Sequence, residues 1–121
     1  MQRASAVRVI VAAALALMLA GCHSYHIDAT IENRTGGPIK LLEVDYPSAS
    51  FGLDRLNSGA IFHYRFQVLG SGPLSVQYTP PDGHQIQING PTLRERQQGQ
   101  LEIVLLPGAK AQFLPSLEVN P

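Results

Sequence analysis

The chain has 121 residues, which is enough for a single domain with a modest hydrophobic core. Lys and Arg together number 9 and Asp and Glu number 9, so the chain lacks the basic excess that a nucleic-acid-binding protein needs. Charged residues are only 15% of the chain, and its 11 glycines and 9 prolines favour a turn-rich β protein over long helices or disorder.

The first residues have the pattern of an export signal. Residues 1–8 contain two arginines and no acid, and residues 9–20 form an unbroken apolar run. This run is well short of the roughly 20 residues that a membrane-spanning helix needs, so a permanent transmembrane anchor is disfavoured. The only cysteine, Cys22, follows almost directly and has no partner for an intramolecular disulfide.

The sequence Leu19-Ala20-Gly21-Cys22 resembles the lipobox of bacterial lipoprotein precursors at each of its four positions. The resemblance covers residues 1–22 and implies a signal peptide, 1–21, that is cut between Gly21 and Cys22. It also implies a diacylglyceryl group on the Cys22 thiol and, in many members, an acyl group on the new terminal amine. Two or three acyl chains attach a protein stably to a membrane. The alternative is an ordinary secretory signal, which would leave a free thiol in an oxidising compartment.

The residue after the cysteine bears on which membrane receives the protein. In lipoproteins of enteric-type bacteria, an aspartate at that position is associated with retention in the inner membrane. His23 stands there in this chain, so the resemblance implies the outer membrane of the cell envelope, facing either the periplasm or the cell surface. Removing residues 1–21 also removes two arginines, which leaves the mature part slightly acidic.

The mature chain is expected to enter a sheet directly after a short lipidated tether, 22–24. Apolar and polar residues alternate through 25–33, which is typical of a half-buried strand. A turn at 34–38 precedes a second expected strand at 39–46, whose apolar residues change parity after Leu41 and so predict a β-bulge or burial on both faces. The Asn-Arg-Thr sequence that starts at Asn33 matches a glycosylation sequon but is interpreted as a turn cap.

Segment 47–58 has no regular pattern and is expected to be a loop with at most a short edge strand. Phe51 and Leu53 in this segment are candidates for an exposed surface that contacts a partner, and the alternative is that they close the end of the core. The clearest expected strand follows, with apolar residues alternating against polar ones. This alternation predicts core positions for Phe62, Tyr64, Phe66 and Val68.

The second half of the chain contains further expected strands. Strands at 74–78 and 84–89 are joined by a turn at 80–83, with the alternating Leu, Val, Tyr and Ile residues pointing inward. The polar segment 92–100 is expected to be a solvated loop or a helical turn. Two arginines there, Arg94 and Arg96, are candidates for contact with an anionic partner, and an ordinary charged loop is the alternative. Strands are also expected at 101–106, where Leu101, Ile103 and Leu105 alternate with the residues between them, and at 109–114, with Phe113 inward.

These elements predict an all-β fold. About seven short strands, separated by turns at intervals of roughly 8–12 residues, are typical of a small antiparallel immunoglobulin-like or fibronectin-like β-sandwich, here over 25–115 after the N-terminal signal helix. A small closed barrel is the alternative. Residues 116–121 are expected to be a frayed C-terminal tail.

The mature chain has no pattern that indicates catalysis or metal binding. His23 and His26 have a spacing that suits a metal only in a helix, whereas the tether is expected to be extended, and the other two histidines have no ligand partner at a suitable spacing. Glu43 and Asp45 share a strand face, as acids often do on solvated sheets. The chain has no Gly-x-Ser-x-Gly sequence, and its cysteine is assigned to the lipid. No catalytic residue, metal or cofactor other than the lipid is therefore predicted.

The leading functional hypothesis is a non-enzymatic, lipid-anchored interaction or accessory module that contacts an envelope protein and no nucleic acid. Addition of a partner strand to a sandwich edge is one mode by which such a module binds. The alternative is a small-ligand or carbohydrate-binding lipoprotein, against which the absence of tryptophan argues weakly. An enzyme with an unfamiliar site is a third hypothesis, and the fold class does not choose among them.

Overall fold

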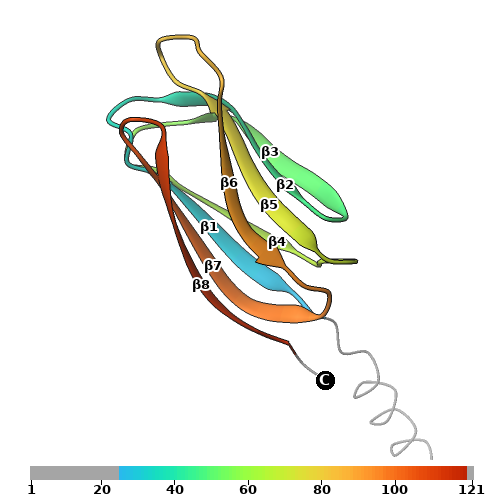
Figure 1. Cartoon of the computed structure of the whole chain (residues 1–121). Helices are drawn as coiled ribbons and strands as arrows, with labels where there is room; N and C mark the ends of the chain where they lie inside the picture. Colours follow the sequence, from blue (N-terminus) through green and yellow to red (C-terminus); the bar gives the residue numbers. More distant parts are fainter. Residues whose placement is uncertain (1–24, 120–121) are drawn as a thin grey trace, which may run out of the picture.

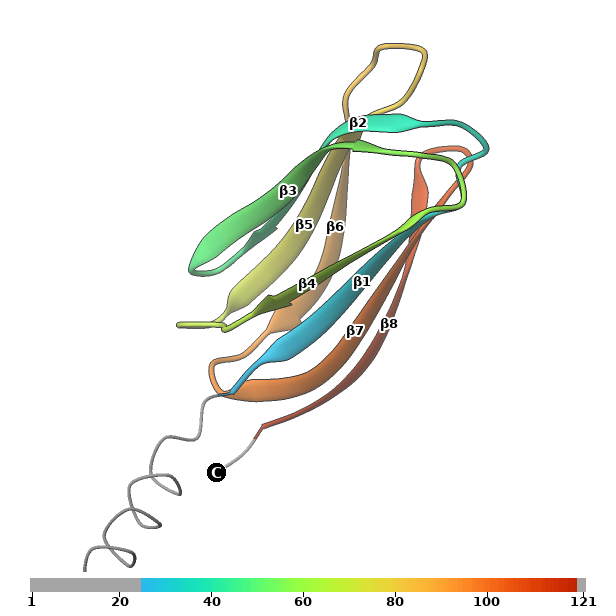
Figure 2. The ribbon, with the colours of Figure 1, turned by 180° about the vertical axis from the view of Figure 1, so that it is seen from behind.

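The computed structural model describes residues 25–119, which form eight β-strands in two sheets (Figures 1 and 2). The strands are β1 (Ile27–Asn33), β2 (Ile39–Tyr46), β3 (Ala49–Leu56), β4 (Ile61–Phe66), β5 (Gly72–Thr79), β6 (Ile86–Leu93), β7 (Gln97–Leu106) and β8 (Lys110–Val119). The first sheet has the order β4-β1-β7-β8 and the second has the order β3-β2-β5-β6. The expectation of a small β-sandwich is confirmed, with one more strand than expected.

Strand pairing is antiparallel except at one place. β1 and β7 are parallel neighbours in register from Ile27 opposite Gly99 to Asn33 opposite Leu105. The two strands are far apart in sequence, and the chain between them passes through the second sheet before it returns. Such a long connection is what a parallel pair requires. The first sheet is therefore mixed, whereas the second is antiparallel throughout.

The core is built from the residues that strand alternation places on the inner faces. β1, β5 and β7 contribute three inward residues each, and all nine are at most 2% exposed: Ile27, Ala29, Ile31, Leu74, Val76, Tyr78, Leu101, Ile103 and Leu105. Sequence alternation grouped these residues along their strands, and the structure places each group on an inner face. Burial of such side chains is the main contribution to the stability of a domain of this size.

Tyr78 makes the stability of the core depend on pH. Its side chain is 1% exposed, and burial raises the pKa of its hydroxyl. The unfolded chain loses this proton near about pH 10, so the stability that Tyr78 contributes is fully present below that pH and is lost as the pH rises above it. We expect Tyr78→Phe to reduce this alkaline loss when urea unfolding is followed from about pH 8 to 11. Parallel stability curves for the two proteins would contradict the expectation.

The predicted bulge lies in β2. Leu41 has a φ of 51° and is 66% exposed, and the register between β2 and β5 shifts between Lys40 and Glu43. The neighbouring β3 accommodates this irregularity with a glycine, because a Cβ atom at Gly52 would overlap the carbonyl oxygen of Leu42. A residue without a side chain is thus required where the two backbones approach.

Gly52→Ala is expected to lower the free energy of unfolding by about 1–3 kcal/mol, because backbone atoms of β2 must move to admit the methyl group. Ser50→Ala is the matched control, since Ser50 is an exposed residue on the same strand. Chemical denaturation of both variants measures the difference. Equal stability of the two variants would show that β2 moves at no cost.

Three sequence expectations about strand boundaries were wrong. Segment 47–58 contains the edge strand that was expected within it, but β3 takes up most of the segment, since it pairs with β2 from Ile39 opposite Leu56 to Tyr46 opposite Ala49. The expected polar loop at 92–100 is reduced to a turn at 94–96, since β6 continues to Leu93, which is fully buried. The expected tail also belongs to the sheet, because β8 extends to Val119 opposite Gln97. In each case pairing with the preceding strand of the chain decides the structure, and local patterns do not record it.

The aromatic residues of β4 are only partly in the core. Phe66 is 3% exposed and Phe62 is half-buried, but Tyr64 is 39% exposed. The expectation that all three rings lie in the core was therefore wrong for Tyr64. β4 is an edge strand of the first sheet, so a side chain on its inner face has neighbours on one side only.

Candidate functional site

The structure describes only some of the residues predicted to be functional. Gly21 and Cys22 lie outside residues 25–119, so the lipidation site remains a sequence prediction. Phe51 is 7% exposed, and its ring stacks on Tyr64 at a centroid distance of 4.1 Å. Leu53 is half-buried and packs against the core. These two residues therefore close the core, which confirms the alternative interpretation, and they do not form the candidate exposed surface.

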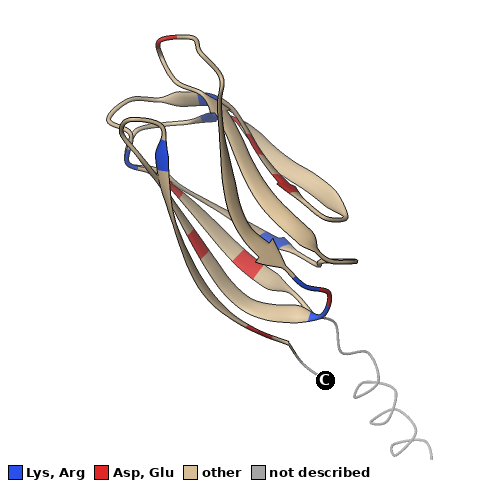
Figure 3. Ribbon diagram, in the orientation of Figure 1, with Lys and Arg blue, Asp and Glu red and all other residues tan. Residues whose placement is uncertain are grey.

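Arg94 and Arg96 lie in the turn between β6 and β7 and are exposed. The Arg94 amide donates a hydrogen bond to the side-chain oxygen of Gln97 at 2.8 Å, and the Gln97 amide donates to the Arg94 carbonyl at 3.2 Å. The turn lies at the end of the sandwich where β1 begins (Figure 3). β3 and β6 are opposite edges of the second sheet, so these arginines are not brought together with Phe51.

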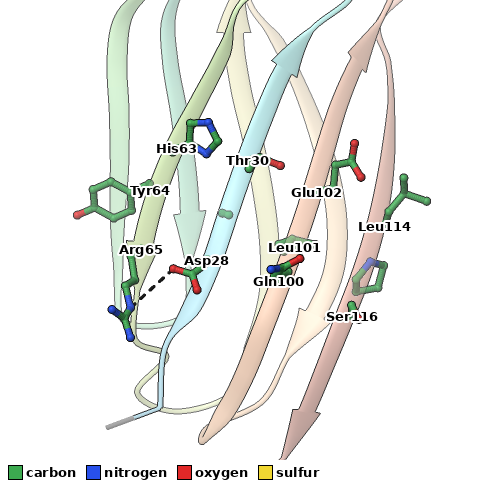
Figure 4. A pocket seen from close by; sticks show the side chains of 12 residues that line it. Asp28, Thr30, His63, Tyr64, Arg65, Gln100, Leu101, Glu102, Leu114 and Ser116 are labelled. Carbon is green, nitrogen blue, oxygen red and sulfur yellow. Dashed lines mark ion pairs between the residues drawn. The ribbon is translucent and has the colours of Figure 1, made fainter.

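An open basin on the outer face of the first sheet gathers polar side chains from four strands (Figure 4). It has a volume of about 940 Å³. Strand register arranges its side chains in two rows across β4, β1, β7 and β8: Arg65, Asp28, Gln100 and Ser116, then His63, Thr30, Glu102 and Leu114. Sequence alternation assigned His63 and Arg65 to a polar face, but only the register shows which residues of other strands lie beside them.

The charges in this basin are loosely held. The Nε atom of Arg65 lies 3.7 Å from Oδ1 of Asp28, and the two side chains are 65% and 62% exposed. This distance exceeds that of a charge-assisted hydrogen bond, and an exposed pair of this kind contributes about 0–1 kcal/mol. Both groups can therefore reorient toward a partner at little cost. Within residues 25–119, no group of three His, Cys, Asp or Glu side chains is arranged to hold a metal ion.

A cluster of aromatic rings joins the edge strands β3 and β4, which belong to opposite sheets. The rings are those of Tyr46, Phe51, Phe62, Tyr64 and Phe66, with Tyr46 and Phe66 4.4 Å apart between centroids. Burial raises the pKa of the Tyr46 hydroxyl, and the nearby hydroxyl of Tyr64 raises it further. The irregular pattern of segment 47–58 does not predict a strand as long as β3, so the place of β3 beside this cluster could not be expected from the sequence.

In the described part of the chain, no helix is long and apolar enough to span a membrane. The sequence matches no protein-family model and no curated protein. A solved structure that resembles the chain is the NMR structure of a protein from Eubacterium rectale, with 15% sequence identity and a TM-score of 0.54. The match covers 75% of this chain and 88% of that chain. The chain is thus similar in fold to that protein, and the likeness extends no further than the fold.

Proposed function

We propose that this protein is a lipid-anchored module of the bacterial cell envelope that acts by contact with another envelope protein and catalyses no reaction. The resemblance of residues 19–22 to a lipobox supports the anchor. The open basin on the outer face of the first sheet is the observation that supports a contact function. Its lining side chains are widely exposed, whereas sites for small ligands usually enclose most of the ligand.

The tether supports action close to the membrane. From Cys22 to the start of β1 at Ile27 the chain spans at most about 18 Å when fully extended. The end of the sandwich that carries the start of β1 would therefore lie near the lipid headgroups, and the first sheet would rise from the membrane. A partner at the membrane surface would be within reach of the basin.

A carbohydrate ligand is less well supported by this geometry. Sugar-binding surfaces commonly offer an aromatic ring as a platform, and Tyr64 is the tyrosine among the residues that line the basin. Figure 4 shows the ring of Tyr64 pointing away from the polar rows, and it stacks on Phe51 instead. The rows themselves contain charged and amide side chains and one leucine, Leu114. Such a polar mixture resembles the rim of a protein contact surface.

The anchor has a direct test. Cys22→Ser is expected to move the protein from the membrane fraction to the soluble fraction, because the thiol that would carry the diacylglyceryl group is gone. Fractionation measures this change, and mass spectrometry of the N-terminal peptide detects the lipid on the unmodified protein. His23→Ser, one residue further on, is the matched control and should leave attachment intact. If the Cys22→Ser protein stayed membrane-bound with an unchanged N-terminus, the anchor proposal would fail.

The contact function has a separate test. A charged substitution in the basin, Thr30→Arg, should abolish recovery of an envelope protein that co-purifies with the wild-type chain after cross-linking in intact cells. Gln87→Arg is the matched control, since Gln87 is exposed on β6 in the other sheet. Loss of the partner in both variants, or in neither, would remove the basin as the contact surface.

A further inference from the structure

The edge strand β4 differs from the other edge strands in the described part of the chain. Exposed strand edges can pair with other chains, and proteins usually block them with proline, lysine or a bulge. β8 begins with Lys110 and contains Pro115, and β6 contains Pro91 and a register shift, whereas β3 is interrupted by Gly52 and by the two neighbouring charged residues Asp54 and Arg55. β4 has none of these features, and all six of its residues pair with β1 in an unbroken register from Ile61 to Phe66.

The hydrogen-bonding groups on the free edge of β4 can be assigned. The Asn33 amide donates to the Ala60 carbonyl at 3.0 Å, which marks these residues as a hydrogen-bonded pair between β1 and the start of β4. Bonded and non-bonded pairs alternate along an antiparallel ladder. The even-numbered residues of β4 therefore bond to β1. The N–H and C=O groups of Ile61, His63 and Arg65 point to the free edge.

Contacts beyond β4 limit the free edge to this short stretch. The Leu69 amide donates to Oγ of Ser48 at 3.2 Å, and that hydroxyl lies 3.4 Å from the carbonyl oxygen of Gln67, to which it donates. These bonds attach the segment after β4 to the turn between β2 and β3. An added strand would therefore pair only along Ile61–Arg65.

The side chains on this stretch define the chemistry of such a strand. On the outer face, Ile61 is 50% exposed and His63 and Arg65 are exposed, with Arg65 held only by its long contact to Asp28. On the inner face, the 39% exposed ring of Tyr64 extends the aromatic cluster to the edge. Acidic residues would complement the outer face, and apolar residues would cover Tyr64 on the inner face.

We propose that β4 accepts an extended segment of a partner protein, in which acidic residues that face His63 and Arg65 alternate with apolar residues that cover Tyr64. This inference rests on the proposed contact function and names the edge that performs it. Pairing of β4 with a second copy around a two-fold axis would be antiparallel and would point the two Ile27 ends in opposite directions. Because the tether is short, that arrangement opposes attachment of both copies to one membrane. The occupant is therefore a segment of a different protein.

The test uses the full chain purified from membranes in neutral detergent and a capped peptide of alternating valine and glutamate. Hydrogen exchange followed by mass spectrometry should show slower exchange in the β4 segment when the peptide is added, and fluorescence anisotropy measures its affinity. Methylation of alternate backbone nitrogens of the peptide should abolish binding, because it removes the ladder hydrogen bonds. Arg65→Glu should weaken binding by about tenfold and favour a peptide with lysine in place of glutamate. Arg94→Glu is the matched control and should change neither the affinity for the glutamate peptide nor the preference between the two peptides.

Several results would overturn the proposal. The first is no slowing of exchange in β4 up to about millimolar peptide, a typical limit for weak binding. The second is slowing confined to β3, β6 or β8. The third is equal binding of the methylated peptide. A fourth is self-association that slows exchange in β4 without peptide, since the occupant would then be a second copy. None of these results depends on Cys22→Ser fractionation, so failure of the anchor is distinguishable from failure of the strand-binding edge.

Discussion

Asn33→Ala is expected to lower the free energy of unfolding by about 2–4 kcal/mol and the melting temperature by roughly 10–20 °C. Asn33 is fully buried, and its side chain makes four hydrogen bonds. Its Nδ2 donates to the carbonyls of Gly37 at 2.8 Å and Leu56 at 3.0 Å. Its Oδ1 accepts from the amide of Thr35 at 3.0 Å and from the hydroxyl of Thr35 at 2.7 Å. Alanine would remove the bonds to the Leu56 carbonyl and from the Thr35 amide, whereas the Gly37 carbonyl would keep its bond from the Thr35 hydroxyl at 3.0 Å.

The same bonds explain why the loss extends beyond one turn. Asn33 ends β1, Gly37 belongs to the turn before β2, and Leu56 ends β3, so one amide side chain connects both sheets. Asn57→Ala is the matched control, since Asn57 is exposed and its side chain accepts one hydrogen bond, from Arg55. Thermal unfolding of both variants gives the comparison. A similar small loss in each would mean that water replaces the bonds of Asn33 without cost.

Ile103→Ala is expected to cost about 4 kcal/mol, the upper part of the range for a large-to-small change in a core. Ile103 is fully buried in β7, between Ile31 on β1 and Phe113 on β8. Both neighbouring strands are held by backbone ladders, so the core has little freedom to collapse into the space. Because a small domain is stable by only about 5–15 kcal/mol, the variant should be close to unfolded at growth temperature.

Ile61→Ala is the matched control for the core substitution. Ile61 is 50% exposed on the outer face of the same sheet, so the same change should cost well under about 1 kcal/mol. Equilibrium denaturation in urea measures both variants. If the two variants lost equal stability, burial in the sandwich would not be the source of the effect.

The contact proposal and the strand-binding proposal share one strand. His63 and Arg65 contribute to the basin through their side chains and to the free edge through their backbone groups. A partner segment paired with β4 would extend the outer face of the first sheet, so its neighbouring residues would reach the basin. Thr30→Arg places a positive charge beside His63 and leaves the free backbone groups of β4 unchanged, so it should not weaken binding of the acidic peptide to β4. The two variants Thr30→Arg and Arg65→Glu thus separate the two parts of the surface.

Several features of the fold follow from local sequence patterns. Alternation grouped the inward residues of β1, β5 and β7 along their strands, because period-two burial is a property of each strand by itself. The parity change after Leu41 predicted the bulge in β2, since a bulge adds one residue to a strand. The interpretation of Asn33 as a turn cap is also confirmed, and its complete burial leaves no room for a glycan in the folded chain.

Other features depend on pairing and packing between strands. β3 and the end of β8 form because β2 and β7 offer them hydrogen bonds, and polar or glycine-containing sequences do not reveal such pairing. Phe51 was a surface candidate in the sequence, and its burial depends on Tyr64 and Phe66 from the opposite sheet. The parallel pairing of β1 with β7 has the same origin, because a long chain segment that visits the second sheet separates the two strands.

The sequence by itself determined the all-β class, the two-sheet core and the prediction of a lipid on Cys22, because alternation, turn residues and a short export motif are local properties. Only the tertiary structure decided which polar side chains share a surface and which edge is open. Register between strands places Asp28 beside Arg65 and Thr30 beside His63, and sheet order leaves β4 with one neighbour. Both depend on pairings between residues far apart in the chain, whose closure entropy and backbone hydrogen bonds no local pattern contains.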